Sequence, residues 1–188
     1  MSLKEINLPL DLKVLKELRA GDPVRLNGPL LSGRDAAHQR LISALQAGKP
    51  LPVNLSGETI YYTGPCPTPP GQVIGSAGPT TSSRMDPYTP TLLKLGLKGM
   101  IGKGQRSPEV IAAMVKYQAV YFAALGGAGA LMARSIKKAE IIAYPELGPE
   151  AIYRLEVRDF PLIVAIDIFG DDLYQKGRAE YCQKTHRI

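Results

Sequence analysis

The chain has 188 residues, of which 45% are hydrophobic and 21% charged, and these values are typical of one soluble globular domain with a sizeable core. Its net charge of +6 comes from 23 basic and 17 acidic residues that are scattered along the sequence, which argues against a nucleic-acid-binding protein. No apolar run approaches the roughly 20 residues that cross a bilayer, and the N-terminus does not resemble a signal peptide, so we expect a cytoplasmic protein without membrane contact.

The first elements are a helix and a pair of strands. Residues 11–18 place apolar side chains at helical spacing, with Asp11 as the N-cap and Gly21 beyond the end. Residues 23–31 surround the pair Asn27-Gly28, which predicts a tight hairpin between two strands.

A second helix is expected from about residue 35 to Gly48, capped by Asp35 or Ser32. Arg34 then lies at the helix N-terminus, where the positive end of the helix dipole disfavours a cation. Either Arg34 and the free backbone amides bind an anion, or Arg34 is an exposed arginine without a partner. His38, one turn further on, is expected to be structural or solvent-facing. The apolar face of this helix is formed by Ala37, Leu41, Ala44 and Leu45.

Residues 50–57 predict a loop and residues 59–63 a strand. The segment Gly64–Gly71 cannot be regular structure, because its four prolines remove four backbone donors. Cys66 in this segment is either packed or, if cations lower its pKa, reactive. The run Gln72–Ile74 resembles a short strand.

The next segment, residues 75–86, has the sequence GSAGPTTSSRMD, with two glycines, five hydroxyl side chains, one arginine and no helical or strand period. Backbone amides, hydroxyls and a guanidinium that converge in a tight loop can bind a carboxylate or a phosphate. A Ser/Thr-rich turn between two elements is the simpler interpretation of the same composition.

The second half of the chain continues the alternation of helices and strands. Helical turns are expected at 91–95, a strand at 97–101, a helix from Ser107-Pro108 to about Tyr117, and a strand at 119–125. The strand at 97–101 ends in Gly102-Lys103-Gly104. Because both neighbours of Lys103 are glycines, its side chain can project into a cleft in which the backbone approaches a ligand. The spacing of these glycines, and the lack of a Ser or Thr directly after the lysine, differ from those of a phosphate-binding loop.

Gly126–Ala130 lacks the third glycine of a dinucleotide-binding motif, so it predicts tight packing of a helix on a strand. Further strands are expected at 139–144, 151–157 and 160–167, followed by a turn at 169–174 and a polar, frayed tail. The whole chain, residues 1–188, is therefore expected to be one α/β domain with its core between about residues 10 and 175.

Metal chemistry has few candidate ligands in this chain. Its two cysteines, Cys66 and Cys182, and its two histidines, His38 and His186, are far apart in sequence. A structural zinc site or a substrate-binding iron–sulfur cluster needs more ligands than these, so no metal or cofactor site is expected in this chain.

Several motifs, in the same order along the chain, resemble the β-type region of iron–sulfur hydro-lyases, the family of class I fumarases and L-tartrate dehydratases. They are Ser32-Gly33-Arg34-Asp35, Tyr62–Pro67, Gly75–Asp86, Gly99–Gly104 and Asp159-Phe160-Pro161. The resemblance implies a swivelling β/β/α fold, a mixed sheet flanked by helices. It also implies a separate β subunit, with a [4Fe–4S] cluster held by a partner α subunit in an α2β2 assembly, and with iron as the Lewis acid at the substrate hydroxyl.

The resemblance assigns roles to residues of this chain. Arg34, Arg84 and Lys103 match the cations that bind the substrate carboxylates, and Thr80 matches the group that transfers a proton at carbon. Gly78 and Thr81 are the further substrate-binding residues that the resemblance implies. Fixed cations stabilise the charge that forms when a proton next to a carboxylate is removed. Family members commonly have glycine where this chain has Ser83.

The implied reaction is the reversible hydration of a C4 dicarboxylate, fumarate to (S)-malate. L-Tartrate dehydration to oxaloacetate and a non-catalytic dicarboxylate-binding domain are the alternatives.

Overall fold

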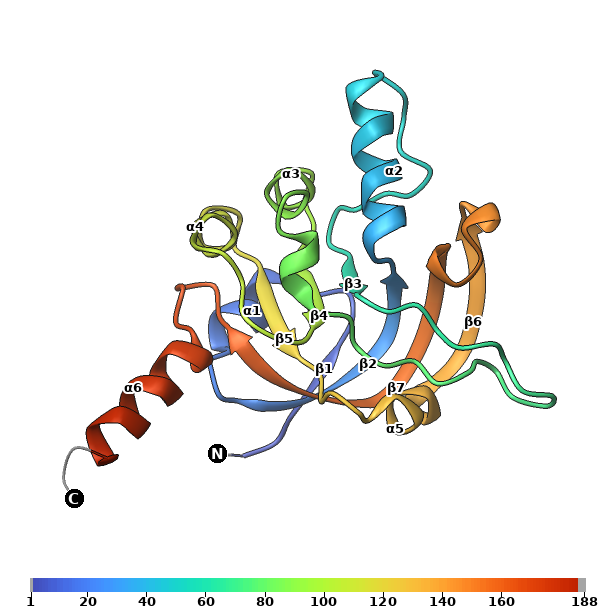
Figure 1. Cartoon of the computed structure of the whole chain (residues 1–188). Coiled ribbons are helices and arrows are strands. Elements are labelled where there is room, and N and C mark those ends of the chain that lie inside the picture. Colours follow the sequence, from blue (N-terminus) through green and yellow to red (C-terminus); the bar gives the residue numbers. More distant parts are fainter. Residues whose placement is uncertain (1, 186–188) are drawn as a thin grey trace.

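The computed structural model describes residues 2–185 and shows one mixed sheet with helices on both sides (Figure 1). Helices α2 (Asp35–Gln46), α3 (Thr89–Lys94) and α4 (Pro108–Tyr117) stand on one side of the sheet, and α5 (Gly129–Ser135) lies on the other. The prediction of an α/β domain with a mixed, helix-flanked sheet is confirmed. Within residues 2–185, no helix has the length and apolar character that crossing a membrane requires.

The sheet has seven strands in the order β1-β2-β3-β4-β5-β7-β6. Neighbours from β1 to β5 are parallel, whereas β7 runs antiparallel to β5, β6 and also β2. The pairings from β2 through β3, β4, β5 and β7 back to β2 therefore close into a ring. The strands are β1 (Lys4–Asn7), β2 (Pro23–Ser32), β3 (Thr59–Tyr61), β4 (Gly99–Gly102), β5 (Val120–Ala123), β6 (Ile136–Ala143) and β7 (Ile152–Ile166).

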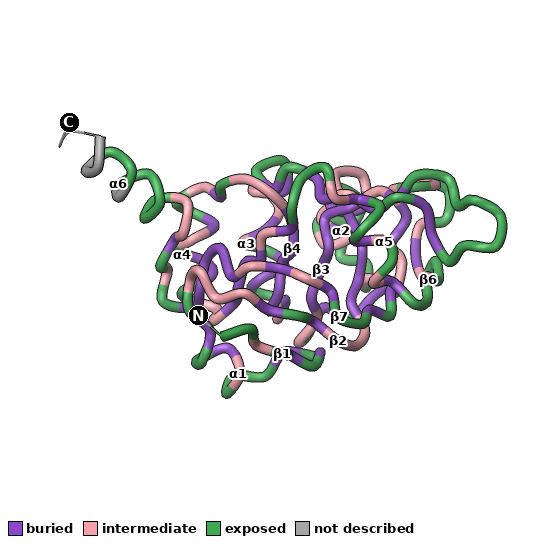
Figure 2. The backbone as a smooth tube through the Cα atoms, turned by 90° about the horizontal axis from the view of Figure 1, so that it is seen from below, coloured by how far each residue is buried: buried purple, intermediate pink, exposed green. Residues whose placement is uncertain are grey.

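The core consists of two apolar clusters on opposite faces of the strands. Successive residues alternate between them, because side chains along a strand point to opposite faces. Tyr61 and Phe122 belong to the cluster on the α1 and α5 side, whereas Tyr62 and Tyr121 belong to the cluster beneath α2, α3 and α4. Figure 2 shows the strands as the buried centre of the domain.

Two helix starts agree with the sequence signals. Helix α1 (Leu12–Glu17) begins after Asp11, whose carboxylate accepts a hydrogen bond from the Val14 amide at 2.7 Å. Helix α4 begins after Ser107, whose hydroxyl accepts one from Val110 at 3.3 Å, and it ends at Tyr117.

The predicted hairpin at Asn27-Gly28 is wrong. The two residues lie inside the continuous strand β2, which has a bulge between Leu26 and Gly28. Gly28 has a φ of +111°, and the Asn27 side chain accepts a hydrogen bond from the Asp159 amide at 2.9 Å. Asp159 itself has a φ of +51°, so the predicted strands at 151–157 and 160–167 form one bent strand, β7.

Three further expectations differ from the structure. Gln72–Ile74 is not a strand, because the loop around it pairs with the proline-rich segment through the Cys66 amide and the Ser76 carbonyl. The N-cap position of α2 is Arg34 rather than Asp35 or Ser32, and the Arg34 side chain makes no capping hydrogen bond to the helix backbone. The frayed tail is largely helix α6 (Leu173–Thr185), which projects from the body in Figures 1 and 2.

Candidate functional site

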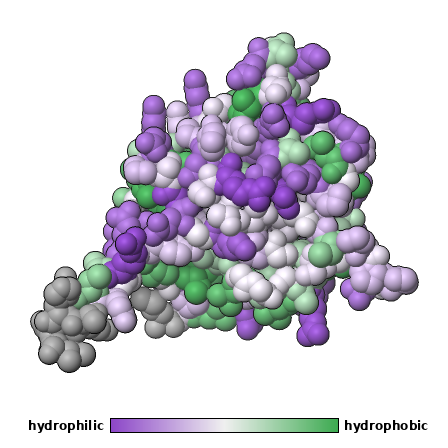
Figure 3. Space-filling model, in the orientation of Figure 1, coloured by the Kyte–Doolittle hydropathy of each residue, from purple (hydrophilic) through white to green (hydrophobic). Residues whose placement is uncertain are grey.

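The predicted site residues come together at the carboxyl ends of neighbouring parallel strands. Arg34 follows β2, the loop that bears Thr80 and Arg84 follows β3, and Lys103 follows β4. Ligands of α/β sheets bind at this end of the strands. In Figure 3, hydrophilic surface gathers at the centre of the visible face, over the region where these strands end.

Arg34 is held on two sides by carboxylates. Its Nε donates to Asp35 Oδ2 at 3.3 Å, and its Nη2 lies 3.2 Å from Glu150 Oε1. Glu150 comes from the 3-10 turn η2 (Pro145–Glu150), and its other oxygen accepts the Ala36 amide at 2.8 Å, which caps α2 from a distance. The alternative of an Arg34 without a partner is therefore wrong.

Asp35 also contacts the second arginine. Its Oδ1 accepts a hydrogen bond of 2.8 Å from Nε of Arg84, which lies on the 3-10 turn η1 (Ser82–Met85). Burial raises the pKa of Asp35, but its own backbone amide, Arg84 and Arg34 outweigh burial and hold this pKa below the ordinary value. Asp35 is thus an anion that links α2 to η1.

Thr80 and Lys103 are joined through their backbones. The Lys103 amide donates to the Thr80 carbonyl at 3.3 Å, the Thr80 amide donates to the Tyr62 carbonyl at 2.7 Å, and Thr81 forms a parallel bridge with Lys103. Thr80 is only 9% exposed. Within residues 2–185, neither the Thr80 hydroxyl nor the Lys103 ammonium has a protein partner for a hydrogen bond or an ion pair.

The loop backbone is shaped by close approaches that require glycine. A Cβ at Gly75 would overlap the Cys66 carbonyl oxygen, and a Cβ at Gly129 would lie 2.9 Å from the Gly78 amide nitrogen. Gly129 starts α5, so the tight packing predicted for 126–130 joins a helix to this loop rather than to a strand. The Gly78 carbonyl in turn accepts a hydrogen bond of 2.9 Å from the Thr63 hydroxyl.

Arg106 is a buried cation that the sequence did not single out. Its Nε lies 2.7 Å from Asp86 Oδ1, its Nη2 donates to the Thr89 hydroxyl at 2.8 Å, and its guanidinium faces the ring of Tyr62 at 5.4 Å. This pair anchors the end of the turn that carries Arg84. Two features of the sequence could have identified this ion pair: Asp86 ends the 75–86 loop, and Arg106 directly precedes Ser107, the cap of α4.

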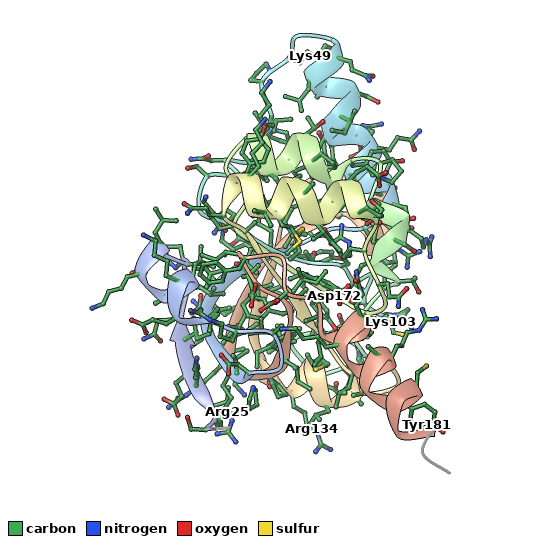
Figure 4. The ribbon with its side chains drawn as sticks, turned by 90° about the vertical axis from the view of Figure 1, so that its left-hand side faces the viewer. Arg25, Lys49, Lys103, Arg134, Asp172 and Tyr181 are labelled. Carbon is green, nitrogen blue, oxygen red and sulfur yellow. The ribbon has the colours of Figure 1, made fainter. Side chains whose placement is uncertain are left out.

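Two tyrosine hydroxyls hold the backbone next to Lys103. Tyr121 donates to the Gly104 carbonyl at 2.9 Å, and the Gly104 amide donates to the Tyr174 hydroxyl at 3.2 Å. Tyr174 belongs to the first turn of α6, and Figure 4 shows Lys103 close to the start of that helix. The C-terminal helix therefore contributes to the geometry of the site.

His38 is buried rather than solvent-facing. Its Nδ1 donates to the Arg34 carbonyl at 2.9 Å, and its Nε2 has no hydrogen-bond partner in the part of the chain that the structure describes. Burial and the nearby Arg106 lower the pKa of His38 to about 4. The second histidine, His186, lies outside the described residues.

The residues of this chain do not fit an iron–sulfur cluster. Cys66 and Cys182 are both exposed, and among residues 2–185 no three His, Cys, Asp or Glu side chains are grouped as metal ligands. Three thiolates are the usual requirement for a substrate-binding cluster, and the whole sequence has two cysteines. Cys66 is thus not packed, and no reactivity is assigned to it.

Comparison with known proteins gives a consistent set of relatives. Residues 2–177 match the family described as Fumarase C-terminus. Fumarate hydratase class I, anaerobic, from Escherichia coli is 41% identical over 182 residues, which are 95% of this chain and 33% of that protein. Fumarate hydratase 2 from Leishmania major is 40% identical over 180 residues, 93% of this chain and 32% of that protein.

A third relative is similar in length to this chain. The protein with the name "Putative L(+)-tartrate dehydratase subunit beta" from Methanocaldococcus jannaschii is 37% identical over 182 residues, 94% of this chain and 93% of that protein. The chain therefore spans about a third of the fumarate hydratases that it matches and nearly all of this subunit.

Proposed function

We propose a function from one established premise: the chain belongs to the Fumarase C-terminus family. It acts as the β-type subunit of a hydro-lyase that reversibly hydrates a C4 dicarboxylate, fumarate to (S)-malate. The observation that carries this proposal is the meeting of three cations, Arg34, Arg84 and Lys103, with Thr80 at the ends of parallel strands.

The three cations bind the carboxylates of the substrate. A C4 dicarboxylate has two negative charges, and removal of a proton next to a carboxylate places further charge on its oxygens. Cations that are already oriented stabilise this charge in the transition state more than in the ground state. Lys103 is suited to direct contact, because it is half-buried and forms no ion pair within the described residues.

Thr80 transfers the proton at carbon. Its backbone is fixed by Tyr62 and Lys103, and its hydroxyl has no hydrogen-bond partner of its own in residues 2–185. A threonine hydroxyl is too weak a base at its ordinary pKa, so the group that activates it lies outside residues 2–185, and we assign it to the partner chain. Gly78 and Thr81 shape the loop around this hydroxyl.

The partner chain corresponds to the remaining two thirds of the fumarate hydratases and holds the [4Fe–4S] cluster, in an α2β2 assembly. This division is supported by the two cysteines of this sequence and by the match over 93% of a relative whose name is that of a beta subunit. The same relative supports L(+)-tartrate as the alternative substrate. In either case a cytoplasmic enzyme is proposed.

The test mixes this chain with the anaerobically reconstituted partner and follows fumarate, malate and L-tartrate. The chain alone should be inactive, and activity should rise in proportion to the complex formed. Lys103→Ala should lower kcat/KM by roughly 30-fold or more, because loss of a desolvated charged contact costs about 2–5 kcal/mol. Lys94→Ala, which removes an exposed lysine on α3, is the matched control and should leave kcat/KM unchanged.

Two outcomes would contradict the proposal. Turnover by the isolated chain would exclude the two-subunit division. Dicarboxylate binding by the complex without any turnover would favour a non-catalytic binding domain.

A further inference from the structure

We propose that Asp35 is a positioning residue, whose single carboxylate orients two substrate-binding arginines by taking the Nε atom of each. Its two oxygens are divided between them: Oδ1 lies 2.8 Å from Nε of Arg84, and Oδ2 lies 3.3 Å from Nε of Arg34. The catalytic consequence of this bridge rests on the proposed function, whereas the bridge itself can be tested without any substrate.

The choice of Nε matters because the guanidinium group is planar and its donors are fixed in direction. When Nε is engaged, the plane is oriented and the terminal Nη groups remain for a ligand. Within residues 2–185, neither Nη of Arg84 has a protein partner, and the Arg84 side chain is 50% exposed. Arg84 can therefore offer both Nη groups to one carboxylate.

The two arginines do not depend on Asp35 equally. Arg34 has a second anchor, because its Nη2 lies 3.2 Å from Glu150, which is itself fixed by the Ala36 amide. A Cβ at Gly64 would lie 3.1 Å from Arg34 Cδ, so that side chain is also confined sterically. Arg84 has no ion-pair partner other than Asp35 in the described part of the chain. Loss of Asp35 should thus release Arg84 more than Arg34.

The bridge has a distinctive kinetic consequence. Asp35→Ala removes the negative charge and both acceptor oxygens, so the positive potential at the site rises while the orientation of Arg84 is lost. Binding of the ground-state dianion should then change little, because the gain in charge offsets the lost contact. The transition state requires the arginine in place, and misplacement by about 1 Å can cost on the order of 100-fold in rate. We therefore expect kcat to fall about 10- to 100-fold, with KM changed by less than about threefold.

The bridge is tested in the full chain by NMR of the arginine Nε–Hε groups, assigned with Arg34→Lys and Arg84→Lys. In Asp35→Ala, the Arg84 signal should move to the position of a free arginine and exchange rapidly with water, while the Arg34 signal shifts less. Glu146→Gln is the matched control, because it removes an ion pair with Arg40 on the same helix α2. An Arg84 signal that is unchanged in Asp35→Ala, or that responds equally to the control, would overturn the proposal.

Kinetics in the reconstituted complex test the consequence. Asp35→Glu keeps the charge and should recover part of kcat, whereas a role in folding alone would lower the amount of complex and leave its kcat intact. If wild-type complex turns over neither fumarate, malate nor L-tartrate, the proposed function fails, and the NMR result still decides the bridge. A wild-type kcat in Asp35→Ala would show that Asp35 does not position the arginines for catalysis.

Discussion

Acid should destabilise this domain through one buried histidine. His38 has a pKa of about 4 in the folded chain, against 6.5 for an exposed histidine, because burial disfavours its charged form and Arg106 lies nearby. Above pH 6.5 the ring is neutral in both states. As the pH falls from 6.5 towards 4, the unfolded chain binds a proton that the folded chain does not, so stability is lost across this window. A difference of this size corresponds to about 3 kcal/mol.

The assay is urea unfolding at several pH values from 7.5 to 4.5, for the wild type and for His38→Phe. The substitution removes the hydrogen bond from Nδ1 to the Arg34 carbonyl, so the variant should be less stable at pH 7.5. Its further loss on acidification should be smaller than that of the wild type by about 2–3 kcal/mol. Carboxylates that titrate in the same range affect both proteins alike and cancel in this comparison. Parallel losses in the two proteins would show that His38 is not buried in its neutral form.

Three other substitutions test the site and its support. Thr80→Val nearly conserves volume and should lower kcat much more than it changes KM; a kcat within about threefold of wild type would remove Thr80 from proton transfer. Gly129→Ala should lower the free energy of unfolding in urea by about 1–3 kcal/mol, because the new Cβ would meet the Gly78 amide. Gly177→Ala on α6, where nothing lies within 4 Å of the new Cβ, should not lower it. Arg106→Met removes the ion-pair partner of Asp86 and leaves it only the Ser107 amide, so it should lower the free energy of unfolding by about 3–5 kcal/mol. Arg40→Met in an exposed pair should lower it little, and equal losses would contradict the anchoring role.

Features that depend on neighbours in the sequence were predictable. The Asp11 and Ser107 caps and the irregular proline-rich segment follow from local chemistry, and all agree with the structure. The family resemblance is also confirmed, by the match over residues 2–177. The roles assigned to individual site residues remain predictions, although the structure brings Arg34, Arg84, Thr80 and Lys103 into one region.

Features that depend on distant residues were not predictable. The Asn27-Gly28 pair predicts a hairpin when its flanks are free, but here the Asn27 side chain holds the amide of Asp159, 132 residues away. The first turn of helix α2 is capped by Glu150, 114 residues away in the sequence, rather than by the neighbouring Ser32 or Asp35. A local pattern cannot specify such partners, because tertiary packing selects them.

The supports of Arg34 connect the stability of the domain to its proposed chemistry. His38 donates to the Arg34 carbonyl, and Glu150 bonds both the Arg34 side chain and the first turn of α2. Protonation of His38 would place a charge beneath the same helix terminus, close to Arg106. The N-terminal turn of α2 should therefore loosen before the sheet unfolds, since local openings cost less than global ones. On acidification, dicarboxylate binding should accordingly be lost at a higher pH than the folded structure. In His38→Phe, which has no ring to protonate, the pH at which binding is lost and the pH at which the domain unfolds should lie closer together.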